Sequence, residues 1–295
     1  MKFERVAIIA MAAVISAPTL AIADDDELEF EEGYVYFELN DTDGDLGIHG
    51  KVDGDAWKKV AIEGPGDRKI MDVKAKSGLR IQGLTELFFE SAEPTFDELD
   101  PEVFFNRFPE GVYEWEGLTL DDEEIEGEAF LSHVIPAAPV VLEVGGQIEN
   151  PGFEEDDGEL EKVCWEDVET DGGVVIVWEE VTQSHFDKWS NGAEPLPGEE
   201  KIPLGASGDL EDIVYYEFVA AIDDTEYKST AVVPAGVTEW TISEEFIELA
   251  EDEGADEIKI EIIVRVETGE YVNDDGETVE STLGNQSAVE DCFEI

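Results

Sequence analysis

From Tyr34 onward the chain alternates apolar and polar residues over short stretches, which Gly, Asp and Pro separate from one another. The clearest example is the stretch IKIEIIVRV, in which every second residue from Ile258 to Val266 is aliphatic. Residues two apart lie on the same face of a strand, so this stretch has one apolar face and one mostly charged face. A sheet with one buried side requires this arrangement, and the pattern therefore predicts an all-β protein.

One short accessory helix is predicted over residues 101–108, in the stretch DPEVFFNRF. Asp100 can cap its N-terminus, and Pro101 suits the first helical position. Its phenylalanines return to one side at helical spacing, and Gly111 follows as a stop signal. This stretch is the one place where the pattern favours a helix over a strand.

A boundary between two strand-rich halves is predicted at HVIPAAPV, residues 133–140, where two prolines bracket small residues. We expect an N-terminal β-domain over 33–134 and a second β-domain over 136–295. Both are predicted to be sandwich-like, because short strands with frequent turns are typical of two packed sheets.

The start of the chain has the pattern of a signal peptide. Lys2 and Arg5 precede an apolar run that ends in the small-x-small pattern AIA, which predicts a signal peptide over 1–23. The run is too short to span a bilayer. Seven of the next nine residues, 24–32, are acidic, and this segment is predicted to be a disordered tail. We expect a secreted, extracellular protein without membrane insertion, with the periplasm as the alternative location.

The charge balance excludes two classes of partner. The chain has 77 acidic and 17 basic residues, with a formal net charge of -60, so nucleic acid and anionic membranes are not expected to bind. Such a charge opposes folding unless salt screens it, and at molar salt the Debye length is only about 3 Å. Because 42% of residues are apolar and 9% aromatic, the chain is not a disordered polyanion. We hypothesise that the acidity is an adaptation to salt.

Six stretches of the second half follow in a familiar order: PAAPVVLEV, GGVVIVWEEVT, IVYYEFVAAI, GVTEWTISEEFIEL, IKIEIIVRVETG and NQSAVEDCFEI. They resemble strands A, B, C, E, F and G of a fibronectin type III domain, over roughly 136–295. The resemblance implies that Trp178 is the buried tryptophan of strand B and that Tyr216 is a core residue of strand C. Ile258 departs from the family, because it stands where the corner tyrosine is expected. The 268–284 loop lacks Arg-Gly-Asp, so integrin binding is not implied.

The chain has two cysteines, Cys164 and Cys292. An even number in an exported chain favours a disulfide. The resemblance places Cys292 on the final strand and Cys164 in the long A–B connection, which can lie against it. Two buried free thiols are the alternative. A metal site is a weaker alternative, since neither cysteine has a second Cys or His at ligand spacing.

Alternating carboxylates in the stretch DTDGD, Asp41, Asp43 and Asp45, raise the question of calcium binding. The EF-hand reading fails, because the sixth position is Leu46 where Gly is needed and the twelfth is Val52 where Glu is needed. Two interpretations remain. A hairpin turn here could hold a weak calcium ion with an affinity of about 0.1–1 mM, or it could use Asp and Gly for backbone reasons alone.

No catalytic motif is found, so no catalytic residue and no cofactor other than calcium is predicted. The histidines His49, His133 and His185 lie in a predicted strand, at the domain boundary and in a predicted loop. They accompany no Gly-x-Ser-x-Gly or His-Glu-x-x-His pattern. The N-terminal half resembles stretches of secreted bacterial proteins, a similarity that implies no activity. An enzyme with an unrecognised acidic site is kept as an alternative, since any two carboxylates about 5 to 10 Å apart could serve a glycosidase.

Tryptophans offer another route to function, because exposed tryptophans on β-sandwiches can bind sugars. The candidates are Trp57, Trp115, Trp165, Trp189 and Trp240. Trp189 lies in the polar insertion QSHFDKWSNGAEPLPGEE and is the one expected to be exposed. The alternative for each is packing in the core, where large aromatic side chains are mostly found.

Together these features predict a secreted, non-catalytic binding or structural module with a protein or polysaccharide partner outside the cell. The alternative function is a carbohydrate-binding or accessory protein of extracellular polysaccharide degradation.

We expect the melting temperature of the mature chain to rise between low salt and molar potassium chloride, because screening weakens repulsion among its carboxylates. Thermal unfolding with EDTA present measures this effect without divalent cations, and an unchanged melting temperature would contradict salt adaptation. Millimolar calcium added to the high-salt sample then separates the two interpretations of the turn. A further rise that Asp43→Asn abolishes indicates a calcium site, whereas no rise indicates a backbone role.

Overall fold

The computed structural model describes residues 28–156, 159–199, 201–210, 213–223, 225–267, 271–272, 276, 278–279 and 283–295. The predicted signal peptide and most of the 268–284 connection lie outside these residues.

The strands are β1 (Leu28–Glu29), β2 (Glu32–Asn40), β3 (Asp45–Gly64), β4 (Arg68–Lys74), β5 (Leu84–Glu90), β6 (Gly111–Thr119), β7 (Glu124–Leu131), β8 (Val141–Val144), β9 (Phe153–Asp156), β10 (Glu159–Lys162), β11 (Val174–Trp178), β12 (Ile213–Ile222), β13 (Lys228–Pro234), β14 (Glu239–Ile242), β15 (Glu257–Glu267), β16 (Tyr271–Val272), β17 (Thr278–Val279) and β18 (Leu283–Glu294). The helices are α1 (Ser77–Gln82), α2 (Pro101–Arg107), α3 (His185–Ser190) and α4 (Glu244–Glu253). None of these helices is long and apolar enough to span a membrane.

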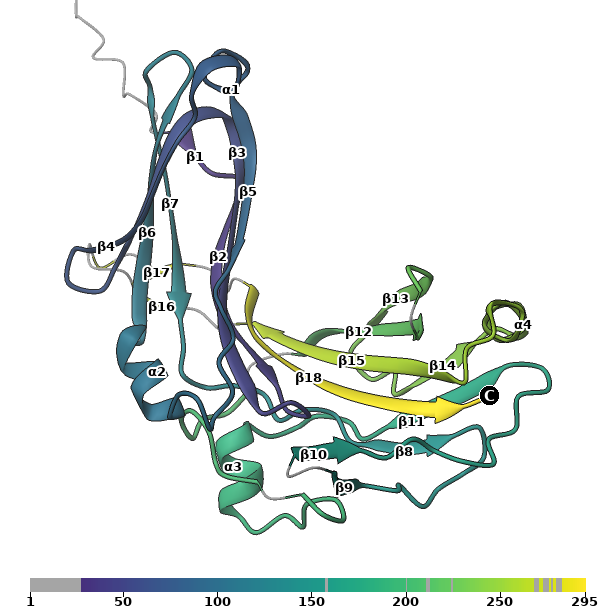
Figure 1. Cartoon of the computed structure of the whole chain (residues 1–295). Coiled ribbons are helices and arrows are strands. Elements are labelled where there is room, and N and C mark those ends of the chain that lie inside the picture. Colours follow the sequence, from purple (N-terminus) through teal and green to yellow (C-terminus); the bar gives the residue numbers. More distant parts are fainter. Residues whose placement is uncertain are drawn as a thin grey trace, which may run out of the picture.

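Strands make up most of the structure, which confirms the all-β prediction (Figure 1). The N-terminal half, β1 to β7, and the C-terminal half, β8 to β18, meet at an angle. In the N-terminal half the 20-residue strand β3 is central. Its first part pairs with β2 and β5, and its last part pairs with β6 and β4. Each half has its own apolar core, and Leu204 of the C-terminal half packs into the N-terminal core.

The C-terminal half is a sandwich-like arrangement of two β-sheets. One layer has the strand order β14-β11-β8, and the other has the order β18-β15-β12-β13. Trp178 on β11 and Tyr216 on β12 are fully buried in the core, as predicted, with ring centroids 5.6 Å apart. Ile258, where the resemblance would place a corner tyrosine, is a buried residue of β15.

The two halves share one eleven-stranded sheet, because the last strand β18 pairs antiparallel with β15 and parallel with β2. The buried Asn285 on β18 reinforces this contact, since its Oδ1 accepts from the Phe37 N–H at 2.8 Å. Its Nδ2 donates to the carbonyls of Ser132 and Val134, at 2.8 and 2.9 Å. The segment predicted to be a boundary, 133–140, is therefore held against β18.

Cys164 and Cys292 form the predicted disulfide, with Cα atoms 4.7 Å apart. Cys292 lies on β18, and Cys164 lies in the connection between β8 and β11, as the resemblance implied. The neighbouring Trp165 extends the contact, because its N–H donates to the Cys292 carbonyl at 2.9 Å and its carbonyl accepts from Glu294 at 3.0 Å. In the chain-entropy model, joining two cysteines that are 128 positions apart in the sequence stabilises the fold by about 5 kcal/mol.

The prediction of a disordered tail over 24–32 is wrong for residues 28–32. Strand β1 pairs parallel with β7, and β2 begins at Glu32. Phe30 is only 8% exposed, and its N–H donates to the Glu126 carbonyl at 2.8 Å. Leu28 and Phe30 lie two residues apart, which is strand spacing, but the acidic residues around them concealed this short signal. Residues 24–27 lie outside the described residues.

The described residues contain four helices where one was predicted. Helix α2 agrees with the prediction, and the Asp100 side chain accepts from the Glu102 N–H as its cap. Helices α3 and α4 begin after Ser184 and Ser243, each of which caps its helix through its side chain. Helix α3 is short and has few apolar residues. Helix α4 has apolar residues at helical spacing, Phe246, Ile247, Leu249 and Ala250, a signal that the assignment of this stretch to strand E overlooked. His185, expected in a loop, is the first residue of α3.

We expect Asn285→Ala to lower the free energy of unfolding by roughly 3 kcal/mol or more, because it leaves one buried N–H and two carbonyls without partners. Urea unfolding in molar potassium chloride measures this loss. The matched control is Asn106→Ala, since Asn106 is exposed and bonds only within its own helix. A loss for Asn285→Ala as small as that of the control would contradict the role of Asn285 at the junction.

Candidate ligand-binding site

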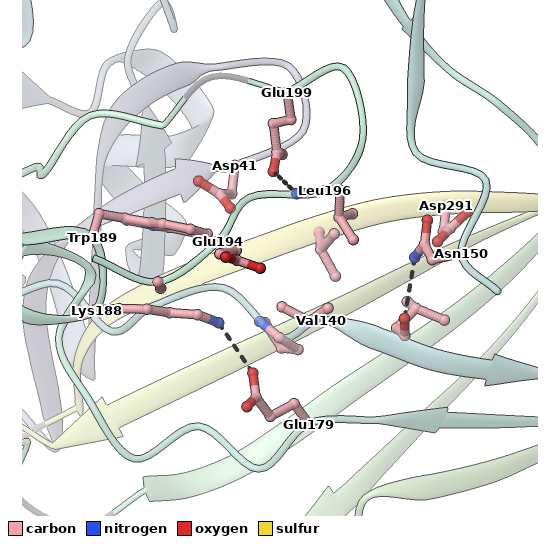
Figure 2. Close-up of a pocket in the computed structure, with 14 residues that line it drawn as sticks. Asp41, Val140, Asn150, Glu179, Lys188, Trp189, Glu194, Leu196, Glu199 and Asp291 are labelled. Atoms are coloured by element: carbon pink, nitrogen blue, oxygen red, sulfur yellow. Dashed lines mark hydrogen bonds and ion pairs between the residues drawn. The ribbon is translucent and has the colours of Figure 1, made fainter. Parts of the chain in front are cut away.

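A pocket of about 270 Å³ lies at the junction of the two halves (Figure 2). Its walls come from the turn after β2, the start of β8, helix α3 with the loop that follows it, and the end of β18. We call it the junction pocket. Its charged lining residues are Asp41, Glu179, Lys188, Glu194, Glu199 and Asp291. Five of these six side chains are acidic, so the pocket disfavours anionic ligands.

Asp41 ties the N-terminal half to the loop after α3. Its Oδ1 is 3.0 Å from His185 Nε2, and its Oδ2 is 3.0 Å from Lys201 Nζ. Burial alone would raise the pKa of Asp41, but the hydrogen bond from His185 and the positive charge of Lys201 outweigh it and lower this pKa to about 2. Lys201 also donates to the Asp41 carbonyl at 2.6 Å and pairs with Glu199 at 2.6 Å. Asp41 is therefore negatively charged and has a structural role, because it holds the loop after α3 against the N-terminal half.

His185 is fully buried beside the pocket and has a defined tautomer. Its Nδ1 accepts from the Leu204 N–H at 3.2 Å, so the ring proton lies on Nε2 and is donated to Asp41. This arrangement uses both ring nitrogens and fixes the first turn of α3 relative to the N-terminal half. His185 therefore positions the pocket wall.

Helix α3 brings Lys188 and Trp189 to the pocket. Ser184 caps the helix by accepting from the Asp187 N–H at 3.0 Å, and Asp187 in turn accepts from Ser207 at 2.8 Å. Lys188 Nζ lies 5.4 Å from the Trp189 ring centroid and 3.2 Å from Glu179. Trp189 is half-buried, and its indole Nε1 is buried without a hydrogen-bond partner.

Asp291 on β18 lies at the other end of the pocket, next to Asn150 (Figure 2). Three donors converge on its Oδ1: Trp165 Nε1 at 3.0 Å, Lys162 Nζ at 3.0 Å and the Cys292 N–H at 2.9 Å. Its Oδ2 is buried and has no partner. Burial raises the pKa of Asp291 although Lys162 lies beside it. The carboxylate thus has one oxygen that accepts from three donors and one buried oxygen without a partner.

The aspartates of DTDGD lie in and beside a hairpin turn between β2 and β3, as expected. The structure does not gather the three carboxylates into one cluster of ligand atoms. Asn40 Oδ1 accepts from the N–H groups of Thr42 and Asp43, at 3.1 and 3.3 Å, which is the backbone role of a turn residue. Calcium binding stays a prediction, with Asp41 already bound to two partners.

Asp45 belongs instead to an acidic strip that crosses β2, β3, β15 and β18 and consists of Glu38, Asp45, Glu93, Glu261 and Glu290. Burial, Glu93, Asp43 and Glu290 raise the pKa of Asp45 to about 7. Burial and neighbouring carboxylates also raise the pKa values of Glu38 and Glu261 to about 7. This strip concentrates negative charge along the shared sheet.

His49, expected in a strand, lies on β3 and is buried beside this strip. Its Nε2 is 2.8 Å from Glu93, and its Nδ1 is 3.8 Å from Glu38. These three residues have the donor types for a divalent cation and offer one ligand atom each within 4.8 Å of one another. The other group of this kind among the described residues contains Cys164 and Cys292, whose sulfurs are joined in the disulfide.

The other tryptophan candidates do not reach the junction pocket. Trp57, Trp115 and Trp165 are at most 1% exposed, which supports the alternative of core packing for them. Trp240 on β14 is half-buried against the C-terminal core. Trp189 alone among the six tryptophans lines this pocket.

Sequence reasoning missed Asp291, Asn150 and Lys201. They lie 109 to 250 residues from Asp41 along the chain, and only the packing of β18 against β2 brings them together. One part of the site was predictable, because the sequence singled out Trp189 and the polar insertion around it. The two predicted residues Asp41 and Trp189 thus line one pocket because of long-range packing, which the sequence around each residue does not indicate.

No protein-family model matches the chain, and no curated protein matches its sequence. Among solved structures, the chain is similar to the FN1-FN3 domains of chicken CNTN1, at 9% identity over 88% of this chain and 68% of that one, with a TM-score of 0.25. It is also similar to a 1.5-MDa bacterial ice-binding adhesin, at 9% identity over 91% and 65% of the chains, with a TM-score of 0.19. Domains of titin match at 14% identity over 85% and 99%, with a TM-score of 0.16. TM-scores this low carry no argument about function.

We expect the protein to be more stable at pH 5 than at pH 7.5. A carboxyl group whose pKa is higher in the folded than in the unfolded state binds more protons when folded, so stability falls as pH rises between the two pKa values. For Glu38, Asp45 and Glu261 this range runs from about 4 to about 7. The melting temperature should therefore drop by a few degrees across it.

Glu261→Gln should shrink this difference, because it removes one carboxylate from the acidic strip. Glu253→Gln, at the exposed end of α4, is the matched control and removes one charge elsewhere. A melting temperature that rises from pH 5 to pH 7.5, or an equal effect of the two variants, would contradict the raised pKa values.

Proposed function

We propose that the protein is a non-catalytic binding module that acts outside the cytoplasm, with the junction pocket as its ligand site. The observation that carries this proposal is the pocket itself, which combines an aromatic side chain, Trp189, with five acidic side chains. Both halves of the molecule supply pocket walls, so ligand binding would stabilise their junction.

The C-terminal half is proposed to be a fibronectin type III domain. The division of its strands between two sheets and the buried Trp178 support this assignment. The predicted signal peptide over 1–23 and the disulfide support an extracellular location, with the periplasm as the alternative. The acidic surface is proposed to be an adaptation to salt.

The carboxylates around the pocket support a binding role over catalysis. Asp41 is held by His185 and Lys201, and Glu179 pairs with Lys188. The hydrogen bond and the two ion pairs give Asp41 and Glu179 structural roles and restrict proton transfer by them. The partner is proposed to be an extracellular protein or polysaccharide that presents a small polar group to the pocket. Trp189 favours the carbohydrate-binding alternative, which the sequence also suggested.

Calorimetric titration of the mature protein with neutral saccharides, primary amines and small carboxylates tests the proposal. We expect one chemical class to bind, and Trp189→Ala to abolish that binding because it removes one wall of the pocket. Trp240→Ala is the matched control, since it deletes a half-buried tryptophan outside the pocket.

Binding that both variants retain would refute the junction pocket as the site, and the absence of binding in all three classes would refute the proposed function. Chromatography of the titrated ligand provides the test of catalysis. Recovery of unchanged ligand is expected, and cleavage would show that the protein is an enzyme.

A further inference from the structure

A group of three possible metal ligands lies outside the junction pocket, on the N-terminal half. Glu38 on β2, His49 on β3 and Glu93 after β5 can supply one ligand atom each, and these three atoms lie within 4.8 Å of one another. Two ligands of one Zn²⁺ ion, each bound at about 2.0–2.2 Å, can be up to about 4.4 Å apart. Small shifts of the side chains are therefore enough to bring all three onto one ion.

The pairing of the strands brings the three residues together. β2 and β3 pair antiparallel with Glu38 opposite Gly47, and residues two apart on a strand share a face, so His49 lies on the same face as Glu38. On its other side β3 pairs with β5, with His49 opposite Glu90, and Glu93 follows three residues later. The sheet thus sets Glu38 beside His49, and the segment after β5 adds Glu93.

Gly47 makes room for the carboxylate of Glu93. A Cβ atom at position 47 would overlap this side chain, because it would lie 2.8 Å from its Cγ and 2.9 Å from its Cδ. Glycine weakens the interior of a strand, and its presence there often marks a close approach by a ligand or another group. At this position the glycine lets Glu93 lie against the strand directly opposite Glu38.

His49 is fixed between the two carboxylates. Its side chain is only 5% exposed, and its ring packs against Tyr36 and Phe88, with centroid distances of 5.2 and 5.9 Å. Its Nε2 lies 2.8 Å from Glu93, whereas its Nδ1 lies 3.8 Å from Glu38, which is longer than a hydrogen bond. The imidazole is therefore already oriented toward both possible ligand oxygens.

The local charge attracts a cation. The main electrostatic effects on Glu38 come from three carboxylates, Glu93, Glu261 and Glu90, and from one cation, Arg265. The guanidinium of Arg265 stacks on an aromatic ring of β2, 4.3 Å from its centroid. Negative charges thus outnumber the positive one at this part of the acidic strip, and a divalent cation would balance them.

We propose that Glu38, His49 and Glu93 form a binding site for one divalent metal ion, with Zn²⁺ preferred over Ca²⁺ and Mg²⁺. Zinc accepts both imidazole nitrogen and carboxylate oxygen, whereas calcium and magnesium take oxygen ligands, so His49 determines the preference. Three protein ligands leave the fourth tetrahedral position to water. The side chains of Glu38 and Glu93 are 22% and 29% exposed, which gives the ion a path from solvent.

The site is connected to the strand that joins the two halves. Gln286 on β18 donates to Glu38 Oε2 and so orients one of the three ligands from the C-terminal half. An ion held by Glu38, His49 and Glu93 would link β2, β3 and the segment after β5. Because the unfolded chain does not hold these residues together, zinc should stabilise the folded state.

Zinc titration of the mature protein, freed of metal with EDTA and then dialysed, tests the proposal. Calorimetry in molar potassium nitrate is suitable, since salt weakens binding to the many scattered surface carboxylates. We expect one Zn²⁺ per chain, bound at least tenfold more tightly than Ca²⁺ or Mg²⁺. Zinc should also raise the melting temperature by several degrees.

Two variants test the ligands. Glu93→Gln removes one ligand oxygen at a partly exposed position and should weaken zinc binding at least about tenfold. The matched control is Glu98→Gln, which removes the same charge from an exposed position five residues away and should leave zinc binding unchanged. Gly47→Ala keeps all three ligands but displaces Glu93, so it should weaken zinc binding about as much as Glu93→Gln.

Three results would overturn the proposal. The first is the absence of saturable zinc binding at millimolar zinc. The second is an equal affinity for Zn²⁺ and Ca²⁺ in the unchanged protein, which would exclude His49 as a ligand and needs no variant. The third is zinc binding that Glu93→Gln and Glu98→Gln weaken equally, because surface carboxylates would then hold the ion. The junction pocket is tested separately, since none of the three ligands lines it.

Discussion

The position of the last strand, β18, is the constraint on which the rest of the structure depends. It pairs with β15 inside the C-terminal sandwich and with β2 of the N-terminal half, so one strand belongs to both halves. Asn285 on this strand makes three hydrogen bonds to backbone groups of the N-terminal half and the boundary segment. The same strand carries Asp291 to the pocket and Cys292 to the disulfide. A change in its register would therefore alter the junction, the disulfide and the pocket together.

Electrostatics give this junction its specificity. In a chain with 77 acidic residues, buried carboxylates near the pocket are matched with the few available cations, Asp41 with Lys201 and Asp291 with Lys162. Buried ion pairs add little net stability because each charge loses hydration, but removing one partner is costly. The Asp41–Lys201 pair thus favours one arrangement of the two halves, whereas Asp291 and Lys162 pair within the C-terminal half. The acidic strip along the shared sheet opposes folding, because its carboxylates repel one another. Protonation of these carboxylates or screening by salt weakens that repulsion.

The parts of the fold that depend on local pattern could be predicted from the sequence. Alternation identified the strands, Asp100 and Pro101 identified α2, and the even cysteine count pointed to the disulfide. The parallel pairing of β18 with β2 could not be predicted, because it joins residues about 250 positions apart and has no local signal. For the site, Trp189 and Asp41 were both singled out, but for separate roles. Their meeting in one pocket depends on that same pairing.

The most direct test of the account is the response of the tryptophan side chains to a bound ligand, followed by ¹H–¹⁵N NMR. The chain has six tryptophans and therefore six indole N–H signals, and the signal that disappears in Trp189→Phe identifies Trp189. On adding a ligand of the class that binds in the calorimetric titration, the account predicts that this signal shifts, because Trp189 lines the junction pocket. A shift confined to another tryptophan, or saturating binding with the Trp189 signal unmoved, would contradict the account.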